Sequence, residues 1–129
     1  MREPSDARKR TIALQERALR FSAAVNSACP KRCNDLPSST VWGQLVRAAD
    51  SMSSNLVEAD NASSTADFIH KMRLTLREAK ESRQALTKLR LSKLDGHDRV
   101  EGLEKEADEL AAIFATIVLK VSNRQRGDS

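Results

Sequence analysis

The side chains that could carry out chemistry in this chain are two histidines, His70 and His97, and two cysteines, Cys29 and Cys33. Nucleophilic catalysis needs a serine or cysteine close to a histidine, and a third group that orients that histidine. His70 lies beside Lys71 on a predicted helix, His97 lies in a predicted turn, and neither is near a sequence feature that would orient it. We therefore expect no catalytic residue, no enzyme activity and no small-molecule substrate.

The two cysteines stand close together in the segment Cys29-Pro-Lys-Arg-Cys33. A zinc site needs about four ligands, and both histidines are far away in the sequence, so the segment does not predict a metal site and we expect no cofactor. A disulfide suits an exported protein, but charges throughout the first twenty positions leave no apolar stretch for a signal peptide. We expect two free thiols near a helix end, with an occasional disulfide or a metal site as the alternatives.

Glu78 and Glu81 are spaced like metal-binding carboxylates on one face of a helix, but they lack the histidine of the di-iron Glu-x-x-His signature. The simplest interpretation is a surface lattice of ion pairs with Arg77 and Lys80. The alternative is that one carboxylate pairs with Arg47 in a partly buried contact that fixes helix register or subunit docking.

The elements that position these residues are predicted to be helices. Glycine (4) and proline (3) are scarce, aromatic residues make up 3% of the chain, and tyrosine is missing. This composition favours helix, because straight-chain residues lose little rotamer freedom there. The longest apolar stretch, residues 110–119, is too short to cross a membrane. We expect an all-α protein of the cytoplasm that does not contact a membrane.

Apolar residues that recur every three or four positions predict four helices. They span about residues 5–29, 39–60, 64–92 and 98–124. We expect the second helix to be capped by Ser38 or Ser39, and the third and fourth to open with capping boxes at residues 64–67 and 98–101. Similar lengths and short loops predict an antiparallel up-down-up-down four-helix bundle that forms one domain, residues 1–129.

The second predicted helix carries little charge. From Ser38 to Val57 the charged residues are Arg47 and Asp50, in a chain that is 31% charged. A helix with one face in the core of a monomer normally carries more charge on its other face. The helix could simply be rich in serine or central to its own bundle, but every helix of a four-helix bundle keeps an outward face. We therefore expect a subunit interface, formed by Arg47, Ser51, Ser54, Asn55 and Glu58.

The charge of the chain is unevenly spread. The net charge is +4, and residues 1–33 and 61–95 hold the positive excess. Basic faces attract phosphate in proportion to the contacts they make. Base recognition is not predicted, because the phenylalanines fall on core positions and Trp42 alone gives no stacking platform. Candidate nucleic-acid-binding residues on the first and third helices are Arg8, Lys9, Arg10, Arg17, Arg73, Arg77, Lys80 and Lys88.

Segments of the second and third predicted helices also resemble a known family. They are residues 44–49 (QLVRAA), 51–59 (SMSSNLVEA), 68–74 (FIHKMRL) and 77–82 (REAKES). In order and spacing they resemble the bacterial four-helix bundle proteins encoded within intervening sequences of 23S ribosomal RNA genes, over about residues 13–121. The family often has proline where Ser53 stands and glycine where Ala59 stands, which predicts a straighter second helix here.

The resemblance implies a homopentameric ring of four-helix bundles with no cofactor and no known chemistry. The chain is also distantly similar to the accessory protein of diversity-generating retroelements, a basic pentamer that works with a reverse transcriptase and its RNA, which implies RNA rather than DNA as a nucleic-acid partner. We expect a non-enzymatic oligomeric scaffold or interaction protein that binds itself. The alternative is an RNA- or DNA-binding accessory protein of low specificity that uses the basic faces of its first and third helices.

Overall fold

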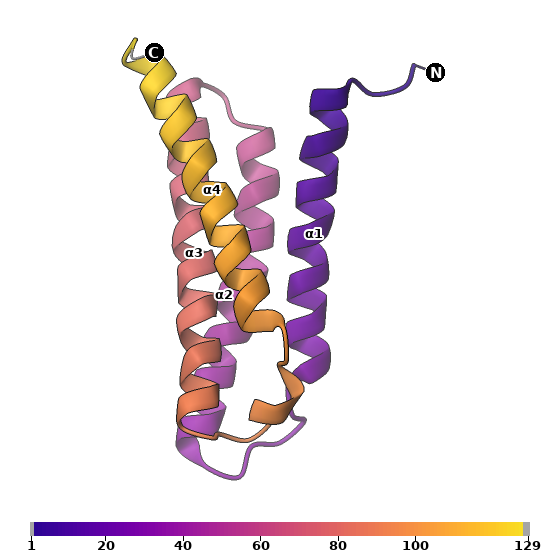
Figure 1. Ribbon diagram of the computed structural model, residues 1–129, viewed down its shortest axis with the longest axis vertical. Helices are drawn as coiled ribbons and strands as arrows, with labels where there is room; N and C mark the ends of the chain where they lie inside the picture. The colour runs from indigo at the N-terminus through magenta and orange to yellow at the C-terminus, as the bar shows by residue number, and fades with distance from the viewer. Residues whose placement is uncertain (1, 128–129) are drawn as a thin grey trace.

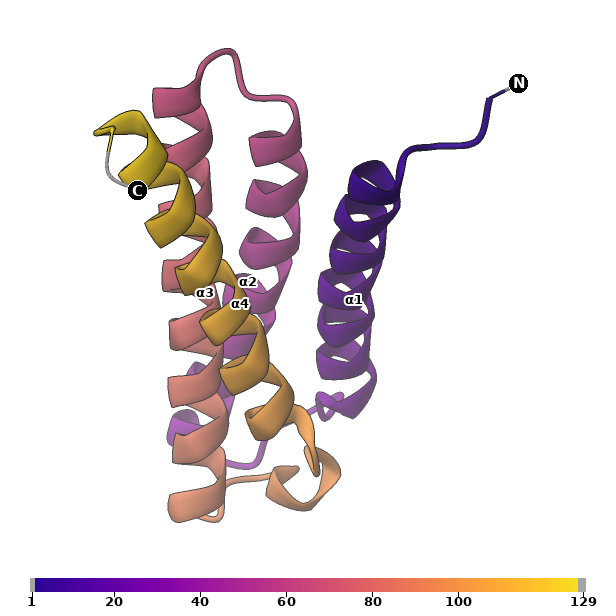
Figure 2. The same ribbon diagram turned by 45° about the horizontal axis from the view of Figure 1, so that its top comes forward.

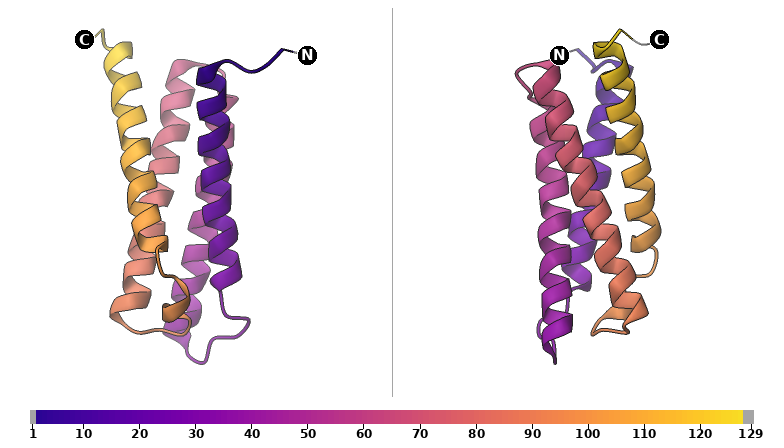
Figure 3. Two further views of the ribbon diagram at one scale, coloured as in Figure 1. Left: turned by 45° about the vertical axis from the view of Figure 1, so that its right-hand side comes forward. Right: turned by 90° about the vertical axis from the view of Figure 1, so that its left-hand side faces the viewer.

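The computed structural model describes residues 2–127, which contain four long helices and no strand (Figure 1). The helices are α1 (Asp6–Ala28), α2 (Leu36–Asp60), α3 (Thr65–Leu91) and α4 (Leu103–Gln125), with a short 3-10 helix, η1 (His97–Arg99), between the last two. Successive helices run in opposite directions (Figures 1 and 3). The predicted all-α, up-down-up-down four-helix arrangement is therefore confirmed. No helix in this part of the chain is long and apolar enough to cross a membrane.

The helices pack as neighbours in chain order. α2 packs extensively on α3 and α3 on α4, whereas α1 contacts α2 more than α4. The distance between α4 and α1 increases along α4, so that the carboxyl end of α4 lies further from α1 than its amino end does (Figures 1 and 2). α1 is therefore the least embedded helix, and α1 and α3 lie diagonally across the bundle.

Two helices begin where the sequence indicates. Ser5 caps α1 by accepting from the Arg8 backbone N–H at 3.1 Å. Ser64 caps α3 by accepting from the Asp67 N–H at 3.0 Å, and Asp67 in return accepts from the N–H of Ser63 at 3.1 Å. α1 and α3 agree with the predicted ranges to within one residue.

The predicted start of α2 is wrong. Asp35 is the cap, because its carboxylate accepts from the backbone N–H of Ser38 at 2.8 Å, and the helix begins at Leu36 with Pro37 in its first turn. Ser38 is fully buried, and its hydroxyl instead accepts from the N–H of Asp95 at 3.0 Å. An acid at the cap and a proline in the first turn are typical of a helix start.

The predicted start of α4 is also wrong. Residues 98–101 do not form a capping box, because the chain there makes η1 and then buries Val100. Gly102 follows with a φ of +82°, a left-handed backbone conformation that glycine adopts readily. This conformation interrupts the helical course of the preceding residues, so α4 begins at Leu103. No side chain caps this start.

The core runs along the whole bundle and includes residues that the apolar spacing places inside. Its largest fully buried side chains include Trp42, Phe114, Leu45, Met52, Met72, Leu86, Leu89 and Leu110. Trp42 closes the end of the bundle where α1 passes into α2, and its indole N–H donates to the carbonyl of Asp95 at 2.7 Å. This bond ties α2 to the loop between α3 and η1.

Candidate subunit interface

The five residues predicted to form a subunit interface all lie on α2, outside the hydrophobic core. In the single chain Arg47, Ser54 and Glu58 are exposed, and Ser51 and Asn55 are half-buried. Arg47 makes no hydrogen bond or ion pair within residues 2–127, whereas Glu58 pairs with Lys71 of α3 at 3.4 Å. The outer face of α2 is thus accessible and mostly uncharged.

Beside this face a groove of about 430 Å³ runs between α2 and α3. It is lined by Gln44, Arg47, Ala48 and Ser51 of α2 and by Glu78, Glu81, Gln84, Ala85 and Lys88 of α3. The groove therefore joins predicted interface residues of α2 to the acidic pair of α3.

Glu78 is the buried charged residue of the groove, with 8% of its surface exposed. It accepts from the guanidinium of Arg77 at 3.3 Å, and Arg77 also pairs with Glu81 at 3.9 Å. Burial raises the pKa of the Glu78 carboxyl, the nearby Glu81 acts in the same direction, and Arg77 acts against both. The ion pairs of Arg77 confirm that part of the predicted lattice, whereas Lys80 makes no ion pair within residues 2–127. Neither carboxylate pairs with Arg47 in the same chain.

A second uncharged face lies on α4, and the interface prediction missed it. No charged residue stands between Glu109 and Lys120. The side chains that this stretch exposes are Ala112, Ala115, Thr116 and Leu119, the last with 61% of its surface accessible. Their spacing of three and four residues places them in one stripe along the helix. The signal for this face in the sequence is the apolar stretch 110–119, which is too short to cross a membrane but is free of charge along the whole helix surface.

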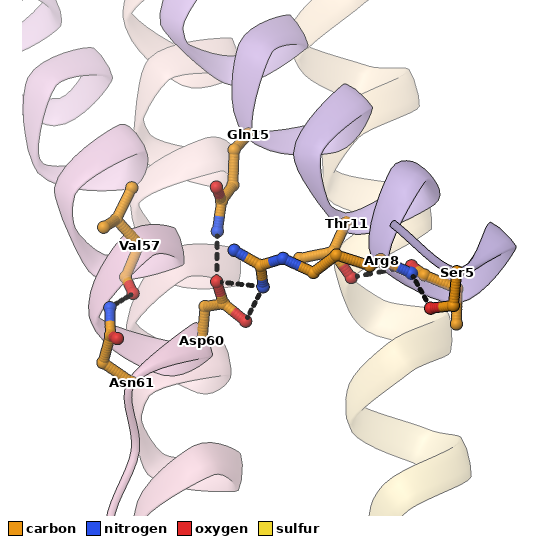
Figure 4. A network of polar contacts seen from close by, with 8 residues as sticks. Ser5, Arg8, Thr11, Gln15, Val57, Asp60 and Asn61 are labelled. Atoms are coloured by element: carbon orange, nitrogen blue, oxygen red, sulfur yellow. Dashed lines mark hydrogen bonds and ion pairs between the residues drawn. The ribbon is translucent and has the colours of Figure 1, made fainter. Parts of the chain in front are cut away.

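Half of the eight candidate nucleic-acid-binding residues are already engaged in ion pairs. Arg8 donates to both carboxylate oxygens of Asp60 at 2.6 and 2.7 Å, and Gln15 adds a bond to Asp60 at 3.2 Å (Figure 4). The bond from Arg8 lowers the pKa of Asp60. Lys9 pairs with Glu3 at 3.1 Å. The ion pairs of Arg8 join α1 to the end of α2 and reduce the positive charge of this face.

Arg17 links the two least embedded neighbours, α1 and α4. Its guanidinium donates to both oxygens of Glu106, at 2.6 and 2.8 Å, and to Glu109 at 2.8 Å. These bonds lower the pKa of Glu106. Sequence spacing does not indicate this contact, because Arg17 lies far along the chain from its partners Glu106 and Glu109.

The remaining basic candidates are scattered. Arg10, Arg73, Lys80 and Lys88 are exposed and make no hydrogen bond or ion pair in the described chain. Since α1 and α3 are diagonal, their basic residues do not form one continuous surface on a single chain.

The histidines and cysteines do not form a metal cluster in residues 2–127. His70 on α3 and His97 in η1 are both exposed, and neither side chain makes a hydrogen bond with this part of the chain. Cys29 and Cys33 are free thiols and are half-buried.

These features define a small antiparallel four-helix bundle with an uncharged outer face on α4 and a face of low charge on α2. The family described as 23S rRNA-intervening sequence protein matches residues 10–116, so the chain belongs to that family. A solved structure with the same fold is that of a protein of unknown function of the S23 ribosomal protein family from Bacteroides thetaiotaomicron VPI-5482. It is 22% identical, with a TM-score of 0.70, over 81% of this chain and 97% of that chain. No curated protein matches.

Proposed function

We propose that this protein is a non-enzymatic scaffold of the cytoplasm that assembles with copies of itself into a ring of five four-helix bundles. The observation that carries the proposal is the buried Glu78 in the groove between α2 and α3, which accepts from the guanidinium of the adjacent Arg77 at 3.3 Å and lies against a second carboxylate, Glu81. A buried carboxylate that shares one guanidinium with a second carboxylate is costly to ionise. Arg47 and Lys88, which line the same groove, also have no partner within residues 2–127. A neighbouring chain seated there brings the hydroxyl of Thr116, the polar side chain of the exposed α4 face, to the Glu78 carboxylate.

A ring needs two different surfaces on each subunit, because its contacts run head to tail. We assign the first surface to the outer face of α2 with the adjoining groove. The second is the α4 stripe, which consists of Ala112, Ala115, Thr116 and Leu119. The faces have one feature in common, because each exposes an aliphatic side chain, Val57 on α2 and Leu119 on α4. The number five is what the family resemblance implies.

Light scattering coupled to size-exclusion chromatography tests the assembly directly. We expect a mass near five times the 14.3 kDa of one chain. Ser54→Glu and Ala115→Glu each place a charge in one of the two surfaces, at a position that is exposed in the single chain. Because an unpaired charge in an interface is strongly unfavourable, each variant should elute as a monomer with unchanged helix content by circular dichroism.

Ala23→Glu is the matched control, because Ala23 is an exposed alanine of α1 outside both surfaces. It should leave the mass of the assembly unchanged. A wild-type protein that is monomeric at micromolar concentration would overturn the proposal.

A further inference from the structure

Both cysteines line one cavity at the end of the bundle where α1 passes into α2. The cavity has a volume of about 440 Å³, and Cys29, Cys33 and Trp42 are among its lining residues. The chain bends at residues 29, 31 and 32, between the end of α1 and Cys33. Both thiols are free and half-buried, so a small oxidant in the cavity can reach either sulfur.

Charges of both signs lie around this cavity. Lys31 and Arg47 also line it, and neither makes a hydrogen bond or ion pair within residues 2–127, while Asp50 is its acidic lining residue. The reactive form of a cysteine is its thiolate, and partial exposure opens a cysteine to oxidants. Burial raises the pKa of Cys33, and the negative charges of Asp95, Cys29 and Asp35 raise it further. The two cysteines are separated by three residues and line the same cavity.

We propose that Cys29 and Cys33 form a dithiol site that hydrogen peroxide oxidises to an intramolecular disulfide. The Cys29 thiolate attacks one peroxide oxygen, an S–O bond forms as the O–O bond breaks, and the departing hydroxide takes up a proton as water. The Cys33 sulfur then attacks the sulfenic sulfur of Cys29, so that the S–S bond forms and the S–O bond breaks. The second hydroxide leaves as water with the proton of Cys33. The two thiols lose two electrons, and the peroxide gains them.

The contacts of the loop confine the rearrangement to a short segment. Just beyond Cys33 the backbone N–H of Asn34 donates to the carboxylate of Asp95 at 2.6 Å, and the indole N–H of Trp42 donates to the Asp95 carbonyl at 2.7 Å. On the other side Cys29 is held at the end of α1, where its N–H donates to the Val25 carbonyl at 3.0 Å. Because both ends are fixed, residues 29–33 alone need to move.

Treatment of the folded full-length protein with hydrogen peroxide tests the site. We expect both thiols to disappear together, the chain to stay a single chain on a non-reducing gel, and dithiothreitol to restore the thiols. Trypsin cleaves after Lys31 and Arg32, between the two cysteines. The peptides 21–31 and 33–47 should therefore stay joined after oxidation and separate on reduction, with the joined mass lower by two hydrogens.

Trp42 gives an independent readout, because it is the sole tryptophan of the chain and lines the same cavity. Its fluorescence should change on oxidation of the wild type, and this change should be absent in Cys33→Ser, which keeps the first thiol but cannot close the bond. The proposal is overturned if both thiols remain titratable at peroxide concentrations that oxidise glutathione. It is equally overturned if oxidation adds oxygen to the cysteines or joins chains to each other instead of linking the two peptides.

Discussion

At the scale of single residues, Glu78 is the charged residue of the described chain that is buried, with 11% of its side chain exposed. Burial raises its pKa, so the folded state holds the proton more tightly than the unfolded state does. The ionisation of Glu78 thus lowers stability as the pH rises from the usual glutamate pKa through the raised one. In the monomeric Ser54→Glu background, Glu78→Gln should increase the free energy of urea unfolding by up to about 1 kcal/mol at neutral pH, with no change in acid.

The matched control is Glu81→Gln, because Glu81 is 52% exposed on the same helix and pairs with the same arginine. It should change stability by less than about 0.5 kcal/mol. In the wild-type background Glu78→Gln should weaken self-association, since the partner chain loses an acceptor. If Glu78→Gln destabilises the monomer at neutral pH, the carboxylate is adequately paired by Arg77 and gives no reason for a partner.

Gly96 is the glycine whose replacement should cost the most. It has a φ of +77°, and a Cβ there would lie 2.9 Å from Cγ of Pro30 and 3.1 Å from Cζ2 of Trp42. Gly102 has nearly the same conformation, with a φ of +82°, but no atom within 4 Å of an added Cβ. Gly102→Ala should destabilise by about 1–2 kcal/mol through backbone strain alone, and Gly96→Ala by more. If both variants lose the same free energy of urea unfolding, the loop shifts to accommodate the added Cβ, and the short contacts with Pro30 and Trp42 add no cost.

At the scale of helices, the cap of α2 separates the observed start from the predicted one. Asp35 accepts from the N–H of Ser38 at 2.8 Å, whereas Ser39 is exposed and its side chain bonds to nothing in residues 2–127. Asp35→Ala should therefore reduce the free energy of unfolding by about 1 kcal/mol. Ser39→Ala is the control and should be neutral. Thermal or urea unfolding measures both, and a loss at Ser39 rather than Asp35 would restore the predicted start.

The first turn of α4 lacks a cap and is held to α3 by Glu104. Its carboxylate accepts from Arg90 at 2.9 Å and from the hydroxyl of Thr87 at 2.6 Å, which lowers its pKa to about 2. A lowered pKa means that this contact stabilises the fold above the usual pKa of 4.5, and that its contribution is lost as the pH falls towards 2. Between pH 4.5 and pH 2, the urea midpoint of Glu104→Gln should therefore fall less than the urea midpoint of the wild type does. An unchanged pH profile in Glu104→Gln would show that the contact adds no stability.

Periodicity predicted the helices better than their ends. The apolar spacing placed α1 and α3 to within one residue, because a core face must repeat every three or four positions. The starts of α2 and α4 depend on a tertiary contact of Ser38 with Asp95 and on the burial of Val100, which no local pattern encodes. The same limit applies to the site. The low charge of α2 was visible in the sequence, but the groove with Glu78 depends on how α3 lies against α2.

At the scale of the whole molecule, variants of the α2 face and of the α4 stripe distinguish between different assemblies. In a head-to-tail ring the α2 face of one chain contacts the α4 stripe of the next. Ser54→Glu then keeps a working α4 stripe, and Ala115→Glu keeps a working α2 face. An equimolar mixture of the two monomeric variants should form a complex of one chain of each, with a mass of about twice 14.3 kDa, and should grow no further because both outer faces of the pair are blocked.

A symmetric contact between two α2 faces gives a different result. Ala115→Glu alone would then associate as the wild type does, since its α2 face is intact, and Ser54→Glu would stay monomeric in any mixture. Light scattering of each variant alone and of the mixture therefore separates the two arrangements without a structure of the assembly. Ala23→Glu mixed with wild-type chain should co-assemble at full mass, because Ala23 lies outside both faces. A mixture of Ser54→Glu and Ala115→Glu that remains monomeric would show that α2 and α4 do not form the two sides of one contact.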